Sequence, residues 1–215
     1  MQGKLKLLLV FLVLFSAACR EILSVDPSAT QAVPKPALES IENPAIRSVL
    51  SNAREQMNVT KKYSQEYFTI DYPNGDPPLE TGACTDVVIR AFRSAGVDLQ
   101  KEVHEDMKAN FALYPNKWEL QRPDTNIDHR RVPNLQMFFN RKGKSIAVSL
   151  RPESYQPGDV VSWDLNGKGM THIGIVSHFW NEQTRRYLII HNIGGGAMAE
   201  DRLFSWKITG HYRYF

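Results

Sequence analysis

Cys84 is the strongest candidate for covalent chemistry in this sequence. The chain has two cysteines, and the other, Cys19, lies in an N-terminal segment of the export type, so Cys84 is expected to be the only free thiol of the mature protein. Cys84 opens a stretch, residues 84–92, in which apolar side chains recur at helical spacing. Unpaired N–H groups and the dipole at a helix N-terminus favour the thiolate, which is the form that attacks carbonyl carbon. We therefore expect a nucleophilic thiol at the start of a helix.

Two histidines downstream, His172 and His191, can share one face of a β-hairpin. If a turn centred on Asn181 and Glu182 joins their strands, the two histidines lie directly opposite each other. A register shift of two residues leaves them on the same face as diagonal neighbours, whereas a shift of one residue separates them. The alternative is that both are ordinary strand histidines. Their placement together with Cys84 favours a cysteine–histidine site.

A polar loop, residues 116–131, is a second candidate region, because loops of this length are often functional. The arginines at its end have the fork geometry that binds a carboxylate, although an internal salt-bridge network is an equal alternative. The carboxylate of Asp86 would oppose thiolate formation if it lies close to the sulfur, but in a first helical turn it also favours the helix dipole. The candidate substrate-binding residues are Asp86, Asp128, His129, Arg130 and Arg131.

Metal chemistry is the main rival to a thiol mechanism. Donor side chains are present at His104, Asp106, Asp128 and His129, yet their spacing resembles no established metal motif. We therefore predict no metal site and no other cofactor.

The elements that must position these residues are helices first and strands afterwards. Helices are predicted over 45–61, from Cys84 to near Gly96, and over 103–114. The last third is rich in β-branched residues separated by turn residues, and the predicted strands are 144–150, 159–164, 170–178, 187–191 and 210–215. Segregation of this kind predicts an α+β domain with an antiparallel sheet, spanning residues 45–215.

The N-terminus predicts export. Lys4 and Lys6 precede a nine-residue apolar run, which is shorter than the roughly 20 residues that span a membrane. Ala17-Ala18-Cys19 resembles a lipobox, with Cys19 as the lipidation site, while ordinary cleavage after Ala18 is the alternative. Arg20 follows the cysteine, and by analogy with enteric lipoproteins this favours the outer membrane. Residues 1–19 are thus expected to be a lipoprotein signal and the proline-bearing residues 20–44 a flexible tether.

The charge balance excludes one class of partner. Without Lys4 and Lys6 the count of basic residues falls from 26 to 24 against 23 acidic ones, so the net charge falls from +3 to +1. Such a chain has no basic footprint for nucleic acid.

The order of these motifs resembles that of NlpC-type (NlpC/p60) cysteine hydrolases, which have a papain-like fold. The blocks that carry the resemblance are Cys84 at a helix start, 157–161 (PGDVV), 172–176 (HIGIV) and 189–191 (IIH). More closely, residues 84–99, 104–107, 126–135 and 210–214 resemble the bacterial domain-of-unknown-function family 1287, over about residues 63–215. That family brings no settled activity with it.

The NlpC resemblance implies a role for each matched residue. Cys84 matches the nucleophile, His172 the general base and His191 the polar group that orients the imidazole. The Cys84 N–H is expected to be one oxyanion donor and the hydroxyl of Tyr72 another. Asn192 is an alternative orienting residue, although strand alternation turns it to the other face. The chain departs from the pattern after the nucleophile, where Thr85-Asp86 stands in place of the usual Ser-Gly.

These observations predict a cell-envelope cysteine hydrolase that cleaves an amide bond through a Cys84 thioester. Peptidoglycan peptides are the expected substrate, and a lipid on Cys19 would attach the protein to the membrane. Acyl transfer is a further alternative, because an amine instead of water can attack the same thioester. The alternative from another class is a catalytically silent lipoprotein of the same fold that binds peptidoglycan or a protein.

Overall fold

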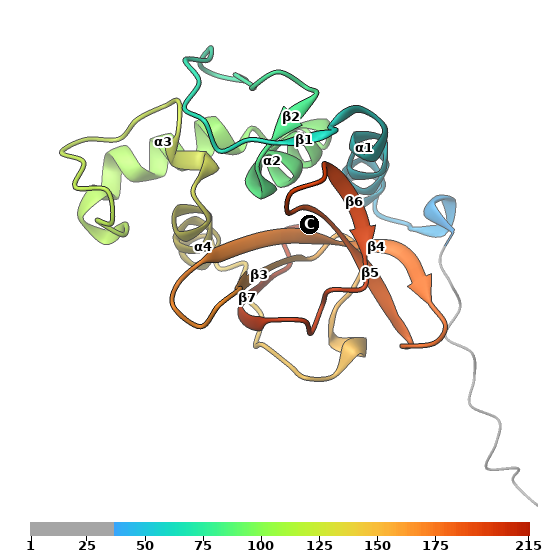
Figure 1. Ribbon diagram of the computed structural model, residues 1–215. Helices are drawn as coiled ribbons and strands as arrows, with labels where there is room; N and C mark the ends of the chain where they lie inside the picture. Colours follow the sequence, from blue (N-terminus) through green and yellow to red (C-terminus); the bar gives the residue numbers. More distant parts are fainter. Residues whose placement is uncertain (1–36) are drawn as a thin grey trace, which may run out of the picture. The chain divides into compact units, whose positions relative to one another are not determined.

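The computed structural model describes residues 37–215, in which helices are followed by a five-stranded antiparallel sheet (Figure 1). The expected signal segment, Cys19 and the tether up to residue 36 lie outside the described residues. No helix within 37–215 is both long and apolar enough to cross a membrane.

Local sequence explains where the helices begin and end. Asn43 caps the first helix by accepting from the N–H groups of Ala45 and Ile46. The second helix begins at Cys84 and ends before Gly96, whose φ of 83° suits glycine. The α-helices are α1 (Pro44–Val59), α2 (Cys84–Ser94), α3 (Leu99–Asn110) and α4 (Val132–Arg141).

The sheet has the strand order β6-β5-β4-β3-β7, with every neighbouring pair antiparallel. Its strands are β3 (Val160–Asp164), β4 (Thr171–Asn181), β5 (Arg186–Asn192), β6 (Ala197–Glu200) and β7 (Lys207–Tyr212). A separate two-stranded parallel pair, β1 (Lys62–Tyr63) and β2 (Thr81–Gly82), lies just before α2.

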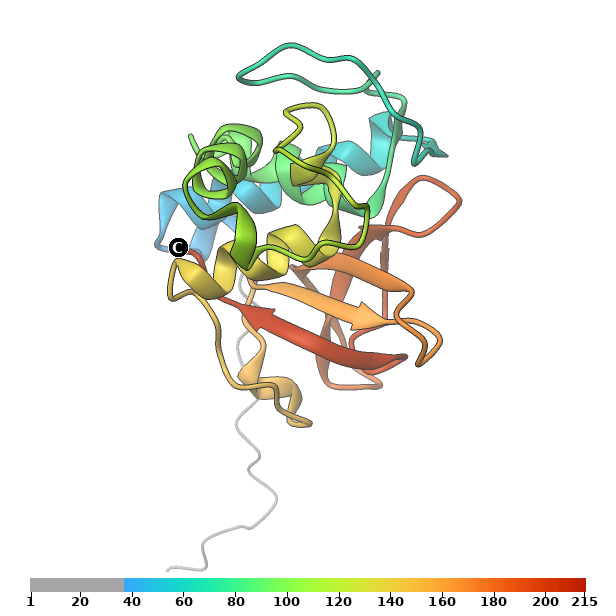
Figure 2. The ribbon, with the colours of Figure 1, turned by 90° about the vertical axis from the view of Figure 1, so that its left-hand side faces the viewer.

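The helices cover one face of the sheet, as the side view in Figure 2 shows. Helix α2 packs on β4 and β5, and its residues 84–92 are all buried. The apolar side chains between the layers include Phe92, Ile173 and Ile190. A second apolar cluster, which includes Trp163, Val176 and Leu203, covers the opposite face. The sheet is therefore buried on both sides, and a polar side chain on either face needs a partner.

The predicted α+β fold, with the Cys84 helix packed on a C-terminal antiparallel sheet, is confirmed. A cysteine-bearing helix followed by histidine-bearing antiparallel strands is the papain-like order that the NlpC resemblance implies. Helix α3 begins at Leu99 rather than at residue 103, because Asp98 caps it by accepting from the N–H of Gln100.

Three sequence-based expectations need correction. Helix α4 and strand β6 were not predicted at all. Residues 144–150 form no strand, and only Ser145 makes an isolated bridge, to Tyr212. Within the expected tether, Leu38 and Ile41 pack against the core, so the folded part of the chain includes residues before Ala45.

Candidate active site

Cys84 is the first residue of α2 and is 5% exposed. Because it opens the helix, its backbone N–H has no partner inside the helix. The backbone N–H of Ile173 in β4 lies near enough to the sulfur to lower the pKa of the thiol. Strand N–H groups lie in the plane of the sheet, so the sulfur lies against the backbone of β4, one residue from His172. The predicted position of the thiol, at a helix start beside the histidine-bearing strand, is what the structure shows.

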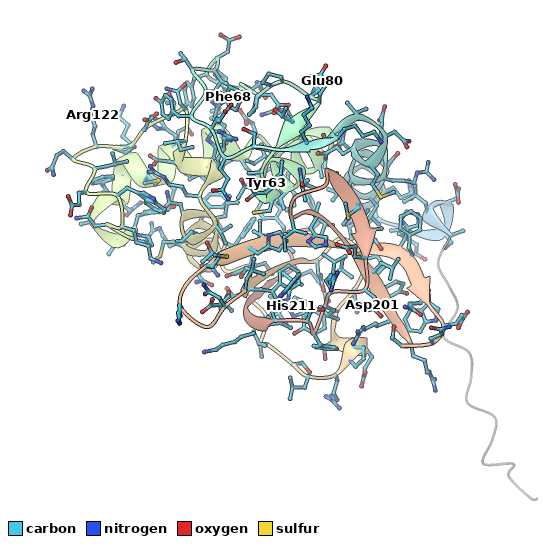
Figure 3. The ribbon with its side chains drawn as sticks, in the orientation of Figure 1. Tyr63, Phe68, Glu80, Arg122, Asp201 and His211 are labelled. Atoms are coloured by element: carbon cyan, nitrogen blue, oxygen red, sulfur yellow. The ribbon has the colours of Figure 1, made fainter. Side chains whose placement is uncertain are left out.

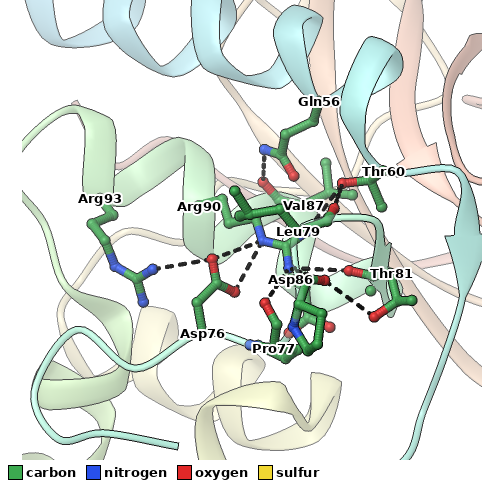
Figure 4. A network of polar contacts seen from close by, with 12 residues as sticks. Gln56, Thr60, Asp76, Pro77, Leu79, Thr81, Asp86, Val87, Arg90 and Arg93 are labelled. Carbon is green, nitrogen blue, oxygen red and sulfur yellow. Dashed lines mark hydrogen bonds and ion pairs between the residues drawn. The ribbon is translucent and has the colours of Figure 1, made fainter.

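A network around Arg90 fixes the loop that leads into Cys84 (Figure 4). The guanidinium donates to the backbone oxygens of Pro77 and Thr81, at 3.2 and 3.0 Å, and forms an ion pair with Asp76 at 2.9 Å. Since Arg90 is in α2 itself, the helix holds its own entry loop in place. A cationic side chain that is 5% exposed has its charge satisfied in this way.

His172 and His191 are in direct contact, with Nε2 of His172 2.7 Å from Nδ1 of His191. The prediction that they share a face is correct, but the prediction that they lie directly opposite is wrong. The register pairs Ile175 with Ile190 and shifts between Val176 and Trp180, which moves the histidines to diagonal positions. His191 lies instead beside Gly174, where a Cβ would come within 3.0 Å of the His191 Cβ.

Two tryptophans enclose the histidine pair. Trp163 is the cross-strand partner of His172, with ring centroids 5.8 Å apart, and Trp206 lies 5.9 Å from the same imidazole. The imidazoles are therefore on the face of the sheet that Trp163 occupies, while Ile173 faces the helices. Among the described residues, no hydrogen bond joins the Cys84 sulfur to either histidine. In unliganded enzymes such contacts are often longer than in the substrate complex.

The electrostatics keep both partners neutral at rest. Burial raises the pKa of Cys84 to about 12, and the Asp86 carboxylate adds to this, while the Ile173 N–H partly offsets it. Burial and then His191 lower the pKa of His172 to about 3. Desolvation therefore opposes the thiolate that the helix N-terminus was expected to favour. Burial therefore favours the neutral form of both the Cys84 thiol and the His172 imidazole.

The tyrosine near the thiol is Tyr63, not Tyr72. Tyr63 pairs with Gly82 across β1 and β2 and lines the same groove as Cys84. Burial raises the pKa of Tyr63, and negative charge on Cys84 raises it further. Its hydroxyl therefore stays protonated and can donate to an oxyanion. Tyr72 is 40% exposed and packs edge-on against His104, away from this groove.

Asn192 does not orient His172. As alternation predicted, it faces the other side of the sheet, where its Nδ2 donates to the backbone oxygens of Gly82 at 2.8 Å and Lys62 at 3.2 Å. Asn192 thus ties β5 to both short strands, which carry Tyr63 and lead into Cys84.

Most of the predicted substrate-binding residues are internal. Asp86 and Arg130 form a two-point ion pair in which each side chain is 1% exposed, so each carries its charge against the other. Asp128 is buried and pairs with Arg131 at 2.9 Å, and His129 is 2% exposed with its pKa lowered to about 3 by burial and then by Arg130. The internal salt-bridge alternative thus holds for Asp86, Asp128 and Arg130, while Arg131 pairs with Asp128 and also borders a groove.

Arg131 lies on a groove of about 400 Å³ that has Cys84 in its lining. Its guanidinium stacks on Trp118, 4.0 Å from the ring centroid, and one of its nitrogens bonds Asp128. Tyr63, Tyr67 and Thr171 also line this groove. Figure 3 shows Tyr63 above β4, on the side of the helical layer.

The sequence did not point to Glu200, the last residue of β6. Its Oε2 lies 3.1 Å from Nε2 of His191, so the histidine pair ends on a carboxylate. The only signal in the sequence is Gly194-Gly195-Gly196, which permit a tight turn between β5 and β6 but do not specify a strand after it.

A second buried histidine–carboxylate pair lies elsewhere. His211 bonds Asp159 at 2.7 Å and stacks on Tyr155, and Arg213 pairs with the same carboxylate. Figure 3 shows His211 below β4, on the other side from Tyr63. Within residues 37–215, no group of three or more His, Cys, Asp or Glu side chains is arranged to hold a metal ion.

The fold and the site define this protein as an α+β domain with a buried cysteine beside a bonded histidine pair. The chain belongs to the family described as Domain of unknown function (DUF1287), which matches residues 50–214. The predicted membership is thereby confirmed.

Two similar proteins illustrate how far the likeness extends. "Uncharacterized protein YijF" from Escherichia coli (strain K12) is 53% identical over 185 residues, which cover 86% of this chain and 88% of YijF. Among solved structures, NlpC1 from Trichomonas vaginalis is similar with a TM-score of 0.42 and 12% identity, over 80% of this chain. This chain spans 45% of that NlpC1 chain.

Proposed function

We propose that this protein is a cell-envelope cysteine hydrolase that cleaves an amide bond through a Cys84 thioester. The observation that carries the proposal is the joint placement of a helix-start thiol against β4 and of a bonded histidine pair beginning one residue away. A groove of about 400 Å³ gives a substrate access to the thiol side of this arrangement. The sequence resemblance to NlpC-type hydrolases supports the same roles.

The proposed reaction begins from the neutral pair. As the sulfur attacks the carbonyl carbon, the thiol proton passes to Nδ1 of His172, because Nε2 is bonded to His191. The carbonyl π electrons move to oxygen, where the Cys84 N–H and the Tyr63 hydroxyl can donate. Collapse breaks the C–N bond, and the His172 proton goes to the leaving amine. Water then hydrolyses the thioester by the same route.

The substrate class that we propose is a peptide with a carboxylate near the scissile amide, such as a peptidoglycan stem peptide. Arg131 supports this choice, since its guanidinium borders the groove and is held flat by Trp118. A guanidinium held in this way presents its N–H groups in a fixed plane, the geometry that carboxylates match.

Export and lipidation belong to the proposal on sequence grounds alone. Cleavage before Cys19 and lipidation of its thiol would hold the domain at the outer membrane, within reach of peptidoglycan. Labelled fatty acid should be incorporated by the wild-type chain and not by a Cys19→Ser variant. Incorporation of the labelled fatty acid by the Cys19→Ser variant would overturn this part of the proposal.

The test of the proposed activity combines turnover with trapping of the intermediate. Stem-peptide amides should yield a free amine and a Cys84 acyl adduct visible by mass spectrometry, and both should be absent in Cys84→Ser. His172→Asn should abolish turnover, while His178→Asn, a matched change on the same strand outside the groove lining, should not. Binding of the peptides with neither amine nor adduct would overturn the proposal.

One observation favours a silent binding protein as the second candidate. Cys84 is buried and its pKa is raised to about 12, so the resting thiol is a weak nucleophile. In that case Cys84→Ser should bind peptidoglycan peptides as tightly as the wild type, and replacement of Arg131 should weaken binding.

Substrate charge gives a further test of the groove. Arg131→Met should lower kcat/KM for a carboxylate substrate by about 10-fold to 100-fold, the effect of losing one hydrogen bond to a charged group. The corresponding carboxamide should be nearly unaffected. Arg122→Met, in the exposed part of the same loop, is the matched control.

A further inference from the structure

Glu200 is placed to act on both histidines without touching the thiol. It ends β6, where His191 pairs with Met198, so Glu200 is two residues along on the same face as His191. Its Oε2 lies 3.1 Å from Nε2 of His191, and its Oε1 lies 3.1 Å from a guanidinium nitrogen of Arg202. The His191 side chain is fully buried and that of Glu200 is 26% exposed. The imidazole therefore has two polar partners, His172 and Glu200.

The Glu200 carboxylate determines which ring nitrogens of His191 and His172 donate and which accept. An ionised carboxylate only accepts, so Nε2 of His191 must carry its proton. Neutral His191 then has a lone pair on Nδ1, which must accept from Nε2 of His172, 2.7 Å away. Neutral His172 with a proton on Nε2 has its lone pair on Nδ1. One carboxylate thus sets the tautomers of two imidazoles in series.

We propose that Glu200 is the positioning residue that keeps the Nδ1 lone pair of His172 free to take the Cys84 proton. The proposal rests on the proposed function. It goes further by assigning a role to a residue that does not contact the thiol. Without the carboxylate, His191 can carry its proton on Nδ1 and donate to Nε2 of His172. His172 would then carry its proton on Nδ1 and present an N–H to the thiol, which cannot accept a proton.

Other charged groups around the pair do not replace this effect. Arg202 is a cation whose charge lowers the pKa of His191, and it donates to the other oxygen of Glu200. Trp163 and Trp206, which enclose the imidazoles, have no acceptor in their side chains. Within residues 37–215, Glu200 is the acceptor that bonds to Nε2 of His191.

The decisive experiment reads the tautomers directly by ¹⁵N NMR of the histidine rings in the full-length protein. The chain has six histidines, and His172→Asn and His191→Asn variants assign the two of interest. We expect both to carry the proton on Nε2 in the wild type. Glu200→Ala should populate the Nδ1–H tautomer of both rings. Glu200→Gln should do so in part, because its amide can either accept from or donate to Nε2.

Exposed Glu153→Gln is the matched control and should leave both rings unchanged. If Glu200→Ala does not fold, the Gln variant, which keeps the size of the side chain, decides. An Nδ1–H tautomer at His191 in the wild type, or unchanged tautomers in the Glu200 variants, would overturn the inference.

Turnover supplies the second readout and separates the two proposals. Glu200→Ala should lower kcat by about 100-fold, less than the roughly 10⁴-fold effect of replacing an orienting carboxylate bonded directly to the catalytic histidine. KM should change little, because Glu200 lies outside the groove lining. If no substrate is cleaved but the tautomers switch as stated, the proposed activity fails while the positioning role of Glu200 stands. If substrate is cleaved and the tautomers do not respond, the role of Glu200 fails.

Discussion

Asp86 and Arg130 bind each other at two points in the interior, with Oδ1 to Nε at 2.8 Å and Oδ2 to Nη2 at 3.0 Å. The same carboxylate accepts from the N–H of Ala83 at 2.6 Å, and Arg130 Nη1 donates to the Glu66 oxygen at 2.8 Å. One ion pair therefore joins the residue before Cys84 to the loop that follows Tyr63. The departure from Ser-Gly after the nucleophile thus has a structural role, because the Asp that replaces Gly holds the helix start.

Replacing either partner of this ion pair should lower the free energy of unfolding substantially. Replacing both partners together should lower it by less than the sum of the two single effects. Arg130→Met leaves a buried carboxylate unpaired and should lower the free energy of unfolding by about 3–5 kcal/mol. Asp86→Asn should cost a similar amount, and the double variant clearly less than the two together. Urea unfolding measures all three. Exposed Arg151→Met should change stability by less than about 1 kcal/mol, and additive single effects would contradict the coupling.

Tyr63→Phe tests the oxyanion donor with Tyr72→Phe as its matched control. Under the proposed function, removal of one oxyanion donor should lower kcat by about 10²-fold to 10³-fold. Tyr72→Phe should have no such effect, because Tyr72 packs against His104 rather than lining the Cys84 groove. Equal rates for wild type and Tyr63→Phe, with an intact fold by circular dichroism, would remove Tyr63 from the mechanism.

The two tyrosines also show where sequence reasoning reaches its limit. The helix start at Cys84, four of the five sheet strands and the shared face of His172 and His191 follow from local sequence patterns. Tyr63 reaches the site through a two-residue parallel pair with β2, and no pattern in the sequence specifies so short a pairing. The NlpC resemblance, which pointed to Tyr72 upstream of Cys84, was therefore misleading for this residue.

The contact of Glu200 with His191 and the raised pKa of Cys84 could not be predicted from the sequence for a related reason. Strand β6 is four residues long and follows three glycines, so its pairing with β5 depends on tertiary contacts. One of these is the Ala197 N–H, which donates to the Thr60 oxygen at 2.9 Å. The pKa of Cys84 depends mainly on how deeply α2 packs on the sheet, whereas the sequence indicated only the helix N-terminus, which lowers this pKa, and the Asp86 carboxylate, which raises it less than burial does.

Gly174→Ala should displace His191 and so disturb its contact with His172. A Cβ on Gly174 would lie 2.7 Å from Cγ2 of Ile189 and 3.0 Å from the His191 Cβ, so β5 must shift. Overpacking of this kind typically costs about 1–3 kcal/mol. Gly195→Ala, whose new Cβ would meet only the flexible end of Met198, is the control and should be nearly neutral. Thermal unfolding measures the cost, and equal melting temperatures for the two variants would show that β5 does not constrain this position.

The pH dependence of Cys84 alkylation tests the neutral resting state. Because burial raises the pKa of Cys84 to about 12, the thiolate fraction near pH 7 should be far smaller than for a free thiol of pKa about 8.5. In a Cys19→Ser chain, where Cys84 is the only thiol, the alkylation rate should rise about tenfold per pH unit from pH 7 to 10 without a plateau.

Two controls define what this profile means. The denatured chain should show an ordinary thiol titration, which proves that the shift belongs to the fold. His172→Ala should change the native profile little, since the pKa of His172 is lowered to about 3 and the resting imidazole carries no charge to stabilise a thiolate. A plateau below pH 8 that disappears in His172→Ala would instead establish a preformed thiolate–imidazolium pair. The proton transfer assigned to the attack step would then already have taken place before substrate binds.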